Sequence, residues 1–374
     1  MKKVLFLFSL VMFGLPSQAI SFMFDFSPAN AVTGITHDDT KIYCATRHKG
    51  LVVIDKITGG MTWYTKESGL LPSNNLIDVV VHDGNLWVSD FNLGALTCVS
   101  ENKTDTLRTS PIQSFSNIVF SVDGKMIVSH GGYVDVYEHG LRTDSVTICP
   151  AVLDGSVWKM KADSRGTLWI TSRTLMSHHG LSCYTPENGF AFVLDAGTDY
   201  PFKDNSATGL AIDGSDHVWF CSGFSDLIEY DGSVFHKHSL GFRVVDMAFD
   251  AYGTLWLLAA DGSLKSFVGS EIADHSGIVQ TTIGYCLDVD GKDVYLGTDQ
   301  GLLKYSDGEY TLFDFSNSPA LVENAVVQSS LGVQNPVYDL SGRQVGQGNK
   351  MTEYQGNKLP KGIYIQNGRK FVVK

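Results

Sequence analysis

Charged residues make up only 18% of this 374-residue sequence, below the quarter that is usual in soluble domains. No helical periodicity is longer than the first apolar run, and no later apolar run is long enough to cross a bilayer as a helix. The net charge of −12 argues against a nucleic-acid-binding surface. These absences favour a β-rich chain without a membrane span after its start and without a nucleic-acid partner.

Motifs of familiar catalysts are also missing. The sequence contains no nucleophile elbow, zinc-protease motif or phosphate-binding loop. Its six cysteines are scattered with no paired spacing, so we expect small buried thiols, although an exported protein can form disulfides. Cys44 and Cys286 fall in the first and last repeat units described below, where a disulfide closing a ring is an alternative.

Three polar clusters suggest metal ligands, but each has a simpler explanation. His178 and His179 are adjacent, and His236 and His238 would share one face of a strand. Neither pair has a third ligand that the sequence can place, so chance clustering is favoured. The stretch 288–293 resembles a calcium loop but lacks the distal glutamate, and it more simply forms a turn. We therefore predict neither a metal site nor a cofactor.

What the sequence does contain is a repeat, a turn followed by a strand that an aromatic residue leads. Asp83-Gly84-Asn85-Leu86-Trp87 returns around Trp169 and again around Trp256. The equivalent anchors are Tyr43, Trp87, Ile127, Trp169, Trp219, Trp256 and Tyr295, about 40 residues apart. A period near 40 with strand-like units indicates the blades of a β-propeller. Seven anchors predict an all-β, seven-bladed β-propeller.

Two further features follow this register. The residue two positions past each anchor is small except at Leu258, which suits tapered packing between blades. A glycine then opens the next strand in six of the units, as at Gly50 and Gly301, where a turn with positive φ needs one. The strand Phe22–Phe26 echoes the end of the seventh blade, so it is a candidate to pair where the ring closes.

The start of the chain has the features of a secretory signal peptide. Lys2 and Lys3 precede an apolar run over residues 4–15, and Ser17-Gln18-Ala19 fits a small-x-small cleavage site. We expect residues 1–19 to be removed, residues 20–319 to form the propeller, 320–334 to be a linker and 335–374 to form a small C-terminal β domain. The protein is then exported, to the cell surface or the medium, with the periplasm as the alternative.

The link Gly69-Leu70-Leu71-Pro72-Ser73-Asn74, the Asp-Gly-Asn-Leu-Trp turn and the glycine-led next strand together resemble the two-component regulator propeller repeat. The resemblance covers roughly residues 32–316. It implies a seven-bladed ring and, in many relatives, the extracytoplasmic sensor part of a hybrid histidine kinase that responds to glycans. Because this sequence shows no kinase region, the resemblance carries over the fold and ligand binding rather than signalling.

The candidate ligand-binding residues lie at one end of the predicted channel. In a propeller, the loops after each second strand and the links between blades share that end. Basic, acidic and aromatic groups there suit a polar ligand such as a sugar. The candidates are Arg47, His48, Asp90, Arg173, His178, Tyr200, Lys203, Arg243 and Asp299. Tyr200 and Lys203 lie in a long excursion over residues 195–206, and insertions on a rigid scaffold often carry function.

The last 40 residues resemble the C-terminal sorting domain of type IX secretion cargo. The resemblance rests on Tyr338-Asp339-Leu340-Ser341-Gly342-Arg343, on Pro360-Lys361-Gly362-Ile363-Tyr364-Ile365 and on a final strand ending in Lys374. It implies the type IX secretion machinery as a partner of residues 335–374. The Asn367-Gly368 pair predicts a two-residue hairpin turn.

Two functions remain open from the sequence. The first is a non-catalytic propeller that binds a glycan or a protein at the loop-rich end. The alternative is a propeller enzyme, a lyase or glycoside-processing enzyme, since lyases acting on streptogramins share a similar Gly-x-Leu-Trp turn. Carboxylates and a histidine converging on the channel would favour the enzyme, whereas scattered loop charges would favour binding.

Overall fold

The structure is a computed structural model, and it divides into two compact units, Met1–Ser318 and Pro319–Lys374. It describes residues 30–91, 93–100, 103–108, 115–130, 133–139, 141–147, 155–174, 180–192, 207–222, 225–275 and 284–316, and the strands between residues 336 and 373. The predicted signal peptide, the strand Phe22–Phe26 and the excursion 195–206 lie outside these residues. No helix in the described part of the chain has the length and apolar character needed to cross a bilayer.

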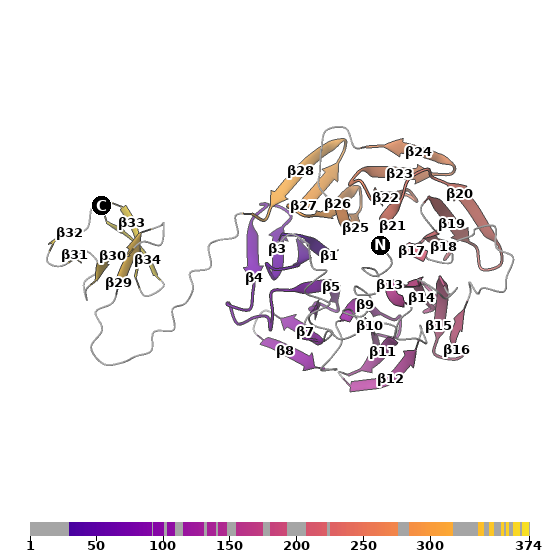
Figure 1. Cartoon of the computed structure of the whole chain (residues 1–374), viewed down its shortest axis with the longest axis horizontal. Helices are drawn as coiled ribbons and strands as arrows, with labels where there is room; N and C mark the ends of the chain where they lie inside the picture. The colour runs from indigo at the N-terminus through magenta and orange to yellow at the C-terminus, as the bar shows by residue number, and fades with distance from the viewer. Residues whose placement is uncertain are drawn as a thin grey trace, which may run out of the picture. The chain divides into compact units, whose positions relative to one another are not determined.

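The first unit contains seven antiparallel sheets of four strands, each built from one continuous segment (Figure 1). The first strand of each sheet lies on the inside of the ring and the fourth lies at the rim. Blades one to four are β1 (Val32–His37), β2 (Lys41–Thr46), β3 (Leu51–Asp55), β4 (Met61–Tyr64); β5 (Leu76–His82), β6 (Asn85–Asp90), β7 (Ala95–Ser100), β8 (Lys103–Arg108); β9 (Phe115–Phe120), β10 (Met126–His130), β11 (Tyr133–Glu138), β12 (Leu141–Thr147); and β13 (Gly155–Ala162), β14 (Leu168–Thr174), β15 (Leu181–Thr185), β16 (Gly189–Phe192). Blades five to seven are β17 (Ala207–Ile212), β18 (Val218–Ser222), β19 (Asp226–Tyr230), β20 (Phe235–Ser239); β21 (Val244–Phe249), β22 (Leu255–Ala259), β23 (Leu264–Val268), β24 (Glu271–Asp274); and β25 (Gly284–Asp290), β26 (Asp293–Thr298), β27 (Gly301–Ser306), β28 (Glu309–Asp314). The seven-bladed propeller expected from the repeat is confirmed.

Each of the seven predicted anchors lies in the second strand of its blade, and an aspartate explains why the turn before it recurs. In blade four, the Asp163 carboxylate accepts hydrogen bonds from the backbone N–H groups of Arg165 and Thr167 and from the indole N–H of Trp169, the last at 3.0 Å. One side chain therefore closes the turn and fixes the anchor at once, which satisfies a buried indole donor.

A hydrogen bond from the anchor side chain to the turn aspartate recurs in blades five, six and one. Asp213 and Asp250 bind the indoles of Trp219 and Trp256 at 3.1 and 3.0 Å. In blade one the Asp38 carboxylate accepts the Tyr43 hydroxyl at 2.6 Å. Burial alone would raise the pKa of Asp38, but hydrogen bonds from Tyr43 and nearby backbone N–H groups outweigh it and lower the pKa to about 2.

Blade three shows what happens when the anchor has no polar atom. Ile127 replaces the tryptophan there, and Ser121 stands six residues before it, where blades four to six have aspartate. The Ser121 hydroxyl still accepts the backbone N–H of Lys125 and closes the turn. An apolar anchor therefore coincides with a shorter turn residue that lacks a second oxygen for an indole.

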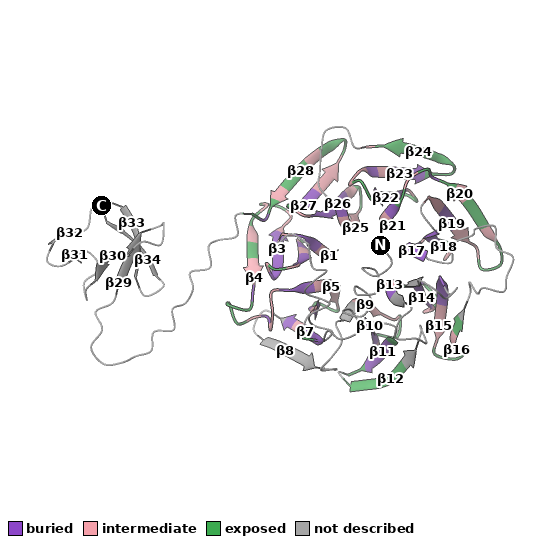
Figure 2. Cartoon of the chain, viewed as in Figure 1, coloured by how far each residue is buried: buried purple, intermediate pink, exposed green. Residues whose placement is uncertain are grey.

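Burial falls from the inner strands to the rim (Figure 2). The second strands β10, β18 and β22 are buried at every residue, whereas β24 is exposed at every residue. The apolar clusters lie between adjacent blades: one joins Trp219 and Leu227 of blade five to Val244 and Phe267 of blade six. Among the described residues, a separate buried cluster therefore lies between each blade and the next around the ring.

The ring closes by packing and charge between blades seven and one, each of which already has four strands of its own. Val32, Cys44 and Tyr295 share one buried cluster at this seam. His37 Nδ1 lies 2.8 Å from Asp288 Oδ2, and the Lys56 ammonium pairs with Asp290. The hydrogen bond from Asp288 raises the pKa of His37 despite its partial burial.

Cys44 and Cys286 lie in the same cluster, but both are free thiols. The Cys286 thiol instead donates to the carbonyl of Val32 at 3.5 Å. Cys183 and Cys221 are free thiols as well. Cys44, Cys221 and Cys286 are buried, as expected of small buried thiols, whereas Cys183 is partly exposed and Cys149 lies outside the described residues.

Two of the predicted strand-opening glycines are needed for close backbone approach. Gly50 and Gly301 have φ of 74° and 138°. A Cβ atom at Gly50 would lie 2.3 Å from the carbonyl oxygen of Tyr64, and one at Gly301 would lie 2.2 Å from that of Phe313. Both carbonyls belong to the fourth strand of the same blade, so only glycine lets the outer hairpin close.

The second unit contains a four-stranded sheet in the order β30-β29-β33-β34 and a short pair. The strands are β29 (Pro336–Asp339), β30 (Gln344–Gln347), β31 (Glu353–Tyr354), β32 (Asn357–Lys358), β33 (Gly362–Gln366) and β34 (Arg369–Val373). Gln366 pairs with Arg369, which leaves two residues for the hairpin loop. The expected strand–turn–strand and hairpin coincide with these strands, and the small C-terminal β domain stays a prediction.

Candidate functional site

The central channel is the best candidate site, and a repeated irregularity of the innermost strands shapes it. In all seven blades the pairing of the first strand with the second is interrupted by a register shift. A bulge of this kind re-aims the side chain beside it. The residues just past the shift in five blades are Gly34, Asp78, Lys159, Asp246 and Cys286, and Asn117 lies within the shift of blade three.

Several of these side chains join one blade to the next. Asp78 Oδ2 accepts the backbone N–H of Ile118 in blade three at 2.9 Å. Asn117 Nδ2 donates to the carbonyl of Trp158 in blade four at 3.2 Å. The carboxylate of Asp246 accepts the N–H of Leu287 in blade seven at 3.0 Å. The polar ring around the channel therefore holds the blades in register, which is first a structural role.

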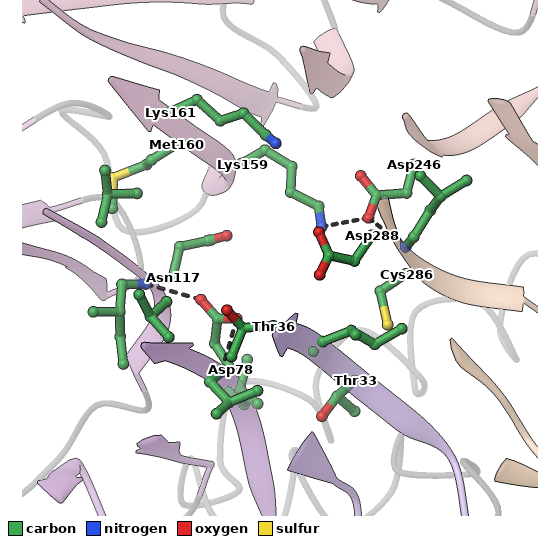
Figure 3. A pocket seen from close by; sticks show the side chains of 18 of the residues that line it. Thr33, Thr36, Asp78, Asn117, Lys159, Met160, Lys161, Asp246, Cys286 and Asp288 are labelled. Atoms are coloured by element: carbon green, nitrogen blue, oxygen red, sulfur yellow. Dashed lines mark hydrogen bonds and ion pairs between the residues drawn. The ribbon is translucent and has the colours of Figure 1, made fainter. Parts of the chain in front are cut away.

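Lys159 and Asp246 form an ion pair from blade four to blade six, with Nζ 2.9 Å from Oδ2 (Figure 3). Burial by itself lowers the pKa of Lys159, but the Asp246 carboxylate outweighs it and raises the pKa, so this lysine stays charged. Burial raises the pKa of Asp78 against the opposing hydrogen bond from Ile118. The channel thus contains a fixed cation, two fixed carboxylates and an amide.

A cavity of about 770 Å³ occupies the channel. Its walls come from the first strands of blades one, two, three, four, six and seven, with Phe91 added from the loop after β6. Polar groups stand among valine, isoleucine and aromatic residues: Thr33, Thr36, Asp78, His82, Asn117, Lys159, Lys161, Asp246 and Asp288. A cavity of this size with a few polar groups on apolar walls suits a small polar ligand.

The ionisable groups of the cavity are largely engaged already. Asp246 holds Lys159 and two backbone N–H groups, while Asp288 binds His37. The His82 ring stacks on Phe120 with centroids 3.8 Å apart. A general acid or base must lie within hydrogen-bond reach of the substrate atom to which, or from which, it transfers a proton. Asp246 and Asp288 therefore have roles in the scaffold. Carboxylates and a histidine nevertheless converge on this channel, which is the arrangement expected of the enzyme alternative.

None of the predicted site residues that the structure describes lines the cavity. Backbone hydrogen bonds from Arg47 to Ala31, from Phe91 to Asn75 and from Ala260 to Arg243 place the loops after the second strands beside the links between blades. Arg243 is exposed, and His48 is exposed after β2. Asp90 ends β6 as a buried residue that accepts the N–H of Leu93.

Of the other candidates, Asp299 follows β26 and is half-buried, and Arg173 lies in β14 opposite Ser156. His178, Tyr200 and Lys203 lie outside the described residues. Arg47 links the predicted set to the cavity: its guanidinium lies 3.8 Å from the ring centroid of Phe91, which lines the cavity. This pair stands at the loop-rich mouth.

The residues that the sequence reasoning missed are those just past the bulges, such as Asp78, Lys159 and Asp246. A signal for them exists. Each stands nine or ten residues before its anchor, as Asp78 does before Trp87, and Asp78 and Asp246 each interrupt an apolar run. A polar residue at one register position of successive repeats indicates a ring around the axis.

No known protein family and no curated protein matches the sequence. Among solved structures, virginiamycin B lyase from Staphylococcus aureus is 13% identical with a TM-score of 0.63, over 77% of this chain and 98% of that chain. The extracellular domain of a putative one-component system from B. thetaiotaomicron is 15% identical with a TM-score of 0.59, over 90% of this chain and 49% of that chain.

One of the lyase structures is a catalytically inactive histidine-to-alanine variant with quinupristin, 13% identical to this chain with a TM-score of 0.63, over 77% of this chain and 97% of that chain. At such identities the similarity shows the fold alone. The chain is an all-β, seven-bladed propeller that resembles the extracellular domains of two-component systems and virginiamycin B lyase.

Proposed function

We propose that this propeller is an exported, non-catalytic binding module for a glycan or protein ligand, part of which enters the channel from the loop-rich mouth. The single observation that carries the proposal is the 770 Å³ cavity, whose polar groups stand among apolar and aromatic walls. Such a lining offers hydrogen bonds to hydroxyl groups and apolar surface to the faces of a sugar ring.

Lys161 is the lining residue best suited to probe this cavity. It is exposed in β13, while Lys159 two residues earlier is held by Asp246. Substituting Lys161 therefore changes the cavity without removing a group that joins the blades. Lys292 is a matched control, because its ammonium pairs with Asp307 in a turn of blade seven.

The test is a glycan-array screen with the mature chain, followed by calorimetry and by product analysis on every hit. We expect saturable binding without turnover, at least about tenfold weaker in Lys161→Ala and unchanged in Lys292→Ala. Turnover of a hit would replace this proposal with the alternative, a propeller lyase or glycoside-processing enzyme. Binding that both variants leave unchanged would place the ligand elsewhere.

Export and sorting form a separate part of the proposal. The signal peptide over residues 1–19 supports export, and the tail motifs over residues 335–374 support recognition by type IX secretion machinery. In a host with that machinery, the full chain should reach the cell surface or medium, and a chain ending at residue 334 should stay in the periplasm. Equal surface delivery of both chains would contradict a sorting role.

A further inference from the structure

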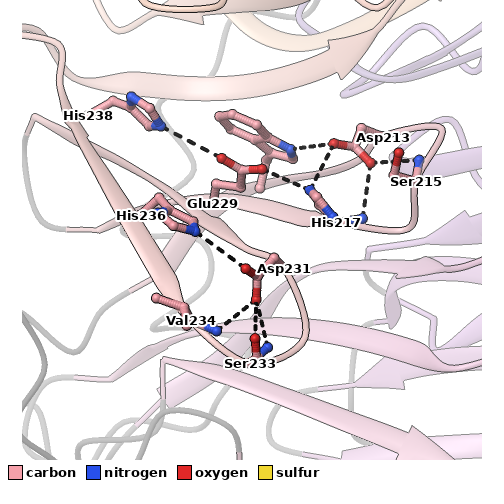
Figure 4. A network of polar contacts seen from close by, with 10 residues as sticks. Asp213, Ser215, His217, Glu229, Asp231, Ser233, Val234, His236 and His238 are labelled. Atoms are coloured by element: carbon pink, nitrogen blue, oxygen red, sulfur yellow. Dashed lines mark hydrogen bonds and ion pairs between the residues drawn. The ribbon is translucent and has the colours of Figure 1, made fainter.

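A cluster of polar side chains lies outside the channel, on blade five (Figure 4). Asp213 directly follows β17, His217 directly precedes β18, and Glu229 lies in β19. Their ligand atoms all lie within 4.8 Å of one another. Each of the three side chains is partly exposed, between 20% and 33%, so an ion from solvent can reach them.

The distances within the cluster resemble the edges of a metal coordination shell. His217 Nδ1 lies 2.8 Å from Glu229 Oε1 and 3.6 Å from Asp213 Oδ2. Ligands bonded at about 2.0–2.2 Å to a tetrahedral Zn²⁺ stand about 3.3–3.6 Å apart. Both measured separations are within a small side-chain rotation of that value. The two carboxylates also bring two negative charges to one place, which a divalent cation would neutralise.

The surroundings hold these side chains in place. The Trp219 indole N–H donates to Asp213 Oδ2 at 3.1 Å. His238 stacks on Trp219 at 5.6 Å, and its Nε2 lies 3.9 Å from Glu229 Oε2. That buried nitrogen has no hydrogen-bond partner in the part of the chain that the structure describes. A rigid outer layer of this kind orients the ligands of metal sites.

Neighbouring blades show that the cluster is not required by the repeat. Four residues after the turn aspartate, blade five has His217 where blades four and six have Thr167 and Thr254. Opposite the anchor, it has Glu229 where they have Cys183 and Ser266. The shared aspartate closes the turn in all three blades, so His217 and Glu229 are additions that the turn does not need.

We propose that Asp213, His217 and Glu229 bind a divalent transition metal such as Zn²⁺, with the remaining coordination position open to water and His238 positioning Glu229. One imidazole with two carboxylates suits Zn²⁺ better than Mg²⁺ or Ca²⁺, which prefer oxygen ligands throughout. The site is independent of the channel, so its test does not depend on the proposed function.

The experiment is calorimetric titration of the mature, tag-free chain with Zn²⁺ after treatment with a chelator, repeated with Mg²⁺ and Ca²⁺. We expect one equivalent of Zn²⁺ to bind, with affinity reduced at least about tenfold in His217→Asn and in Glu229→Gln. His238→Asn should weaken binding less than either. The absorption spectrum of bound Co²⁺ reports the coordination geometry, and near-ultraviolet circular dichroism verifies that each variant is folded.

His236→Asn is the matched control. His236 lies in the same strand as His238, but its Nε2 is 3.3 Å from Asp231, whose carboxylate already binds Ser233 and Val234. This variant should keep the wild-type affinity. Failure of the wild type to bind Zn²⁺ at millimolar concentration would overturn the proposal. So would unchanged affinity in folded His217→Asn and Glu229→Gln, since Zn²⁺ would then occupy other side chains.

Discussion

Blades five and six share one scaffold but carry different polar chemistry. In both, a turn aspartate binds the anchor indole, and a histidine of equivalent position lies against that indole. In blade six, His275 Nε2 is 2.8 Å from the Ser266 hydroxyl, a neutral pair. In blade five, His238 faces Glu229, which also contacts His217. The repeat therefore sets the packing, and a few substitutions within it create a site.

The largest expected effect tests the shared part of the comparison. Trp219→Ala and Trp256→Ala each remove a side chain that is 8% exposed, so each should destabilise the protein by about 3–5 kcal/mol. Urea unfolding followed by circular dichroism measures the loss. A much smaller loss in one variant would mean that the packing of the two anchors does not contribute equally to the free energy of unfolding.

The next largest effect compares the stability lost when the turn aspartate of blade six or of blade five is removed. Asp250→Ala removes the acceptor of two backbone N–H groups and an indole, which should cost about 1–3 kcal/mol. Asp213→Ala should cost less in chelator-treated buffer, because it also relieves repulsion with Glu229. Urea midpoints of the two variants provide the comparison, and a greater loss for Asp213→Ala without metal would contradict it.

A smaller effect depends on pH and belongs to blade six. Burial lowers the pKa of His275 below 6.5, against the opposing charge of Asp274. The unfolded chain therefore takes up this proton first, so the stabilising contribution is present above about pH 6.5 and is lost as the pH falls through the folded pKa. His275→Gln should show a shallower loss of stability on acidification than the wild type. Identical pH profiles from urea unfolding would disprove the assignment.

The smallest stability effect should come from making blade five resemble blade six. Glu229→Ser places a hydroxyl where blade six has Ser266, so it can bind His238 as Ser266 binds His275. In chelator-treated buffer the free energy of unfolding should change by about 0.5 kcal/mol or less. The rise in melting temperature on adding Zn²⁺ should disappear. A retained rise would show that Glu229 is not a ligand.

The sequence predicted the fold well because the repeat places both an apolar anchor and its turn in each unit. The seven anchors and the glycines at Gly50 and Gly301 followed from the spacing of the repeat. The site was harder. Lys159 and Asp246 are 87 residues apart, and their pairing depends on how blades four and six face each other across the channel.

The blade-five cluster shows the same limit more sharply. The sequence paired His236 with His238 because they share a strand face, but Glu229 in β19 contacts His217 in the turn before β18 and lies near His238 in β20. Strand pairing brings Trp219 opposite Glu229, and that register is what brings the Glu229 carboxylate to His217 and Asp213.

By itself, the sequence determined the repeating unit, its number and the turn chemistry, because these depend on residues close together in the chain. The tertiary structure decided which polar groups meet. Closing seven blades into a ring brings residues from distant repeats within hydrogen-bond distance, and burial there sets their charge. Local spacing encodes the blade, whereas the channel and the blade-five cluster exist only once the strands are paired and packed.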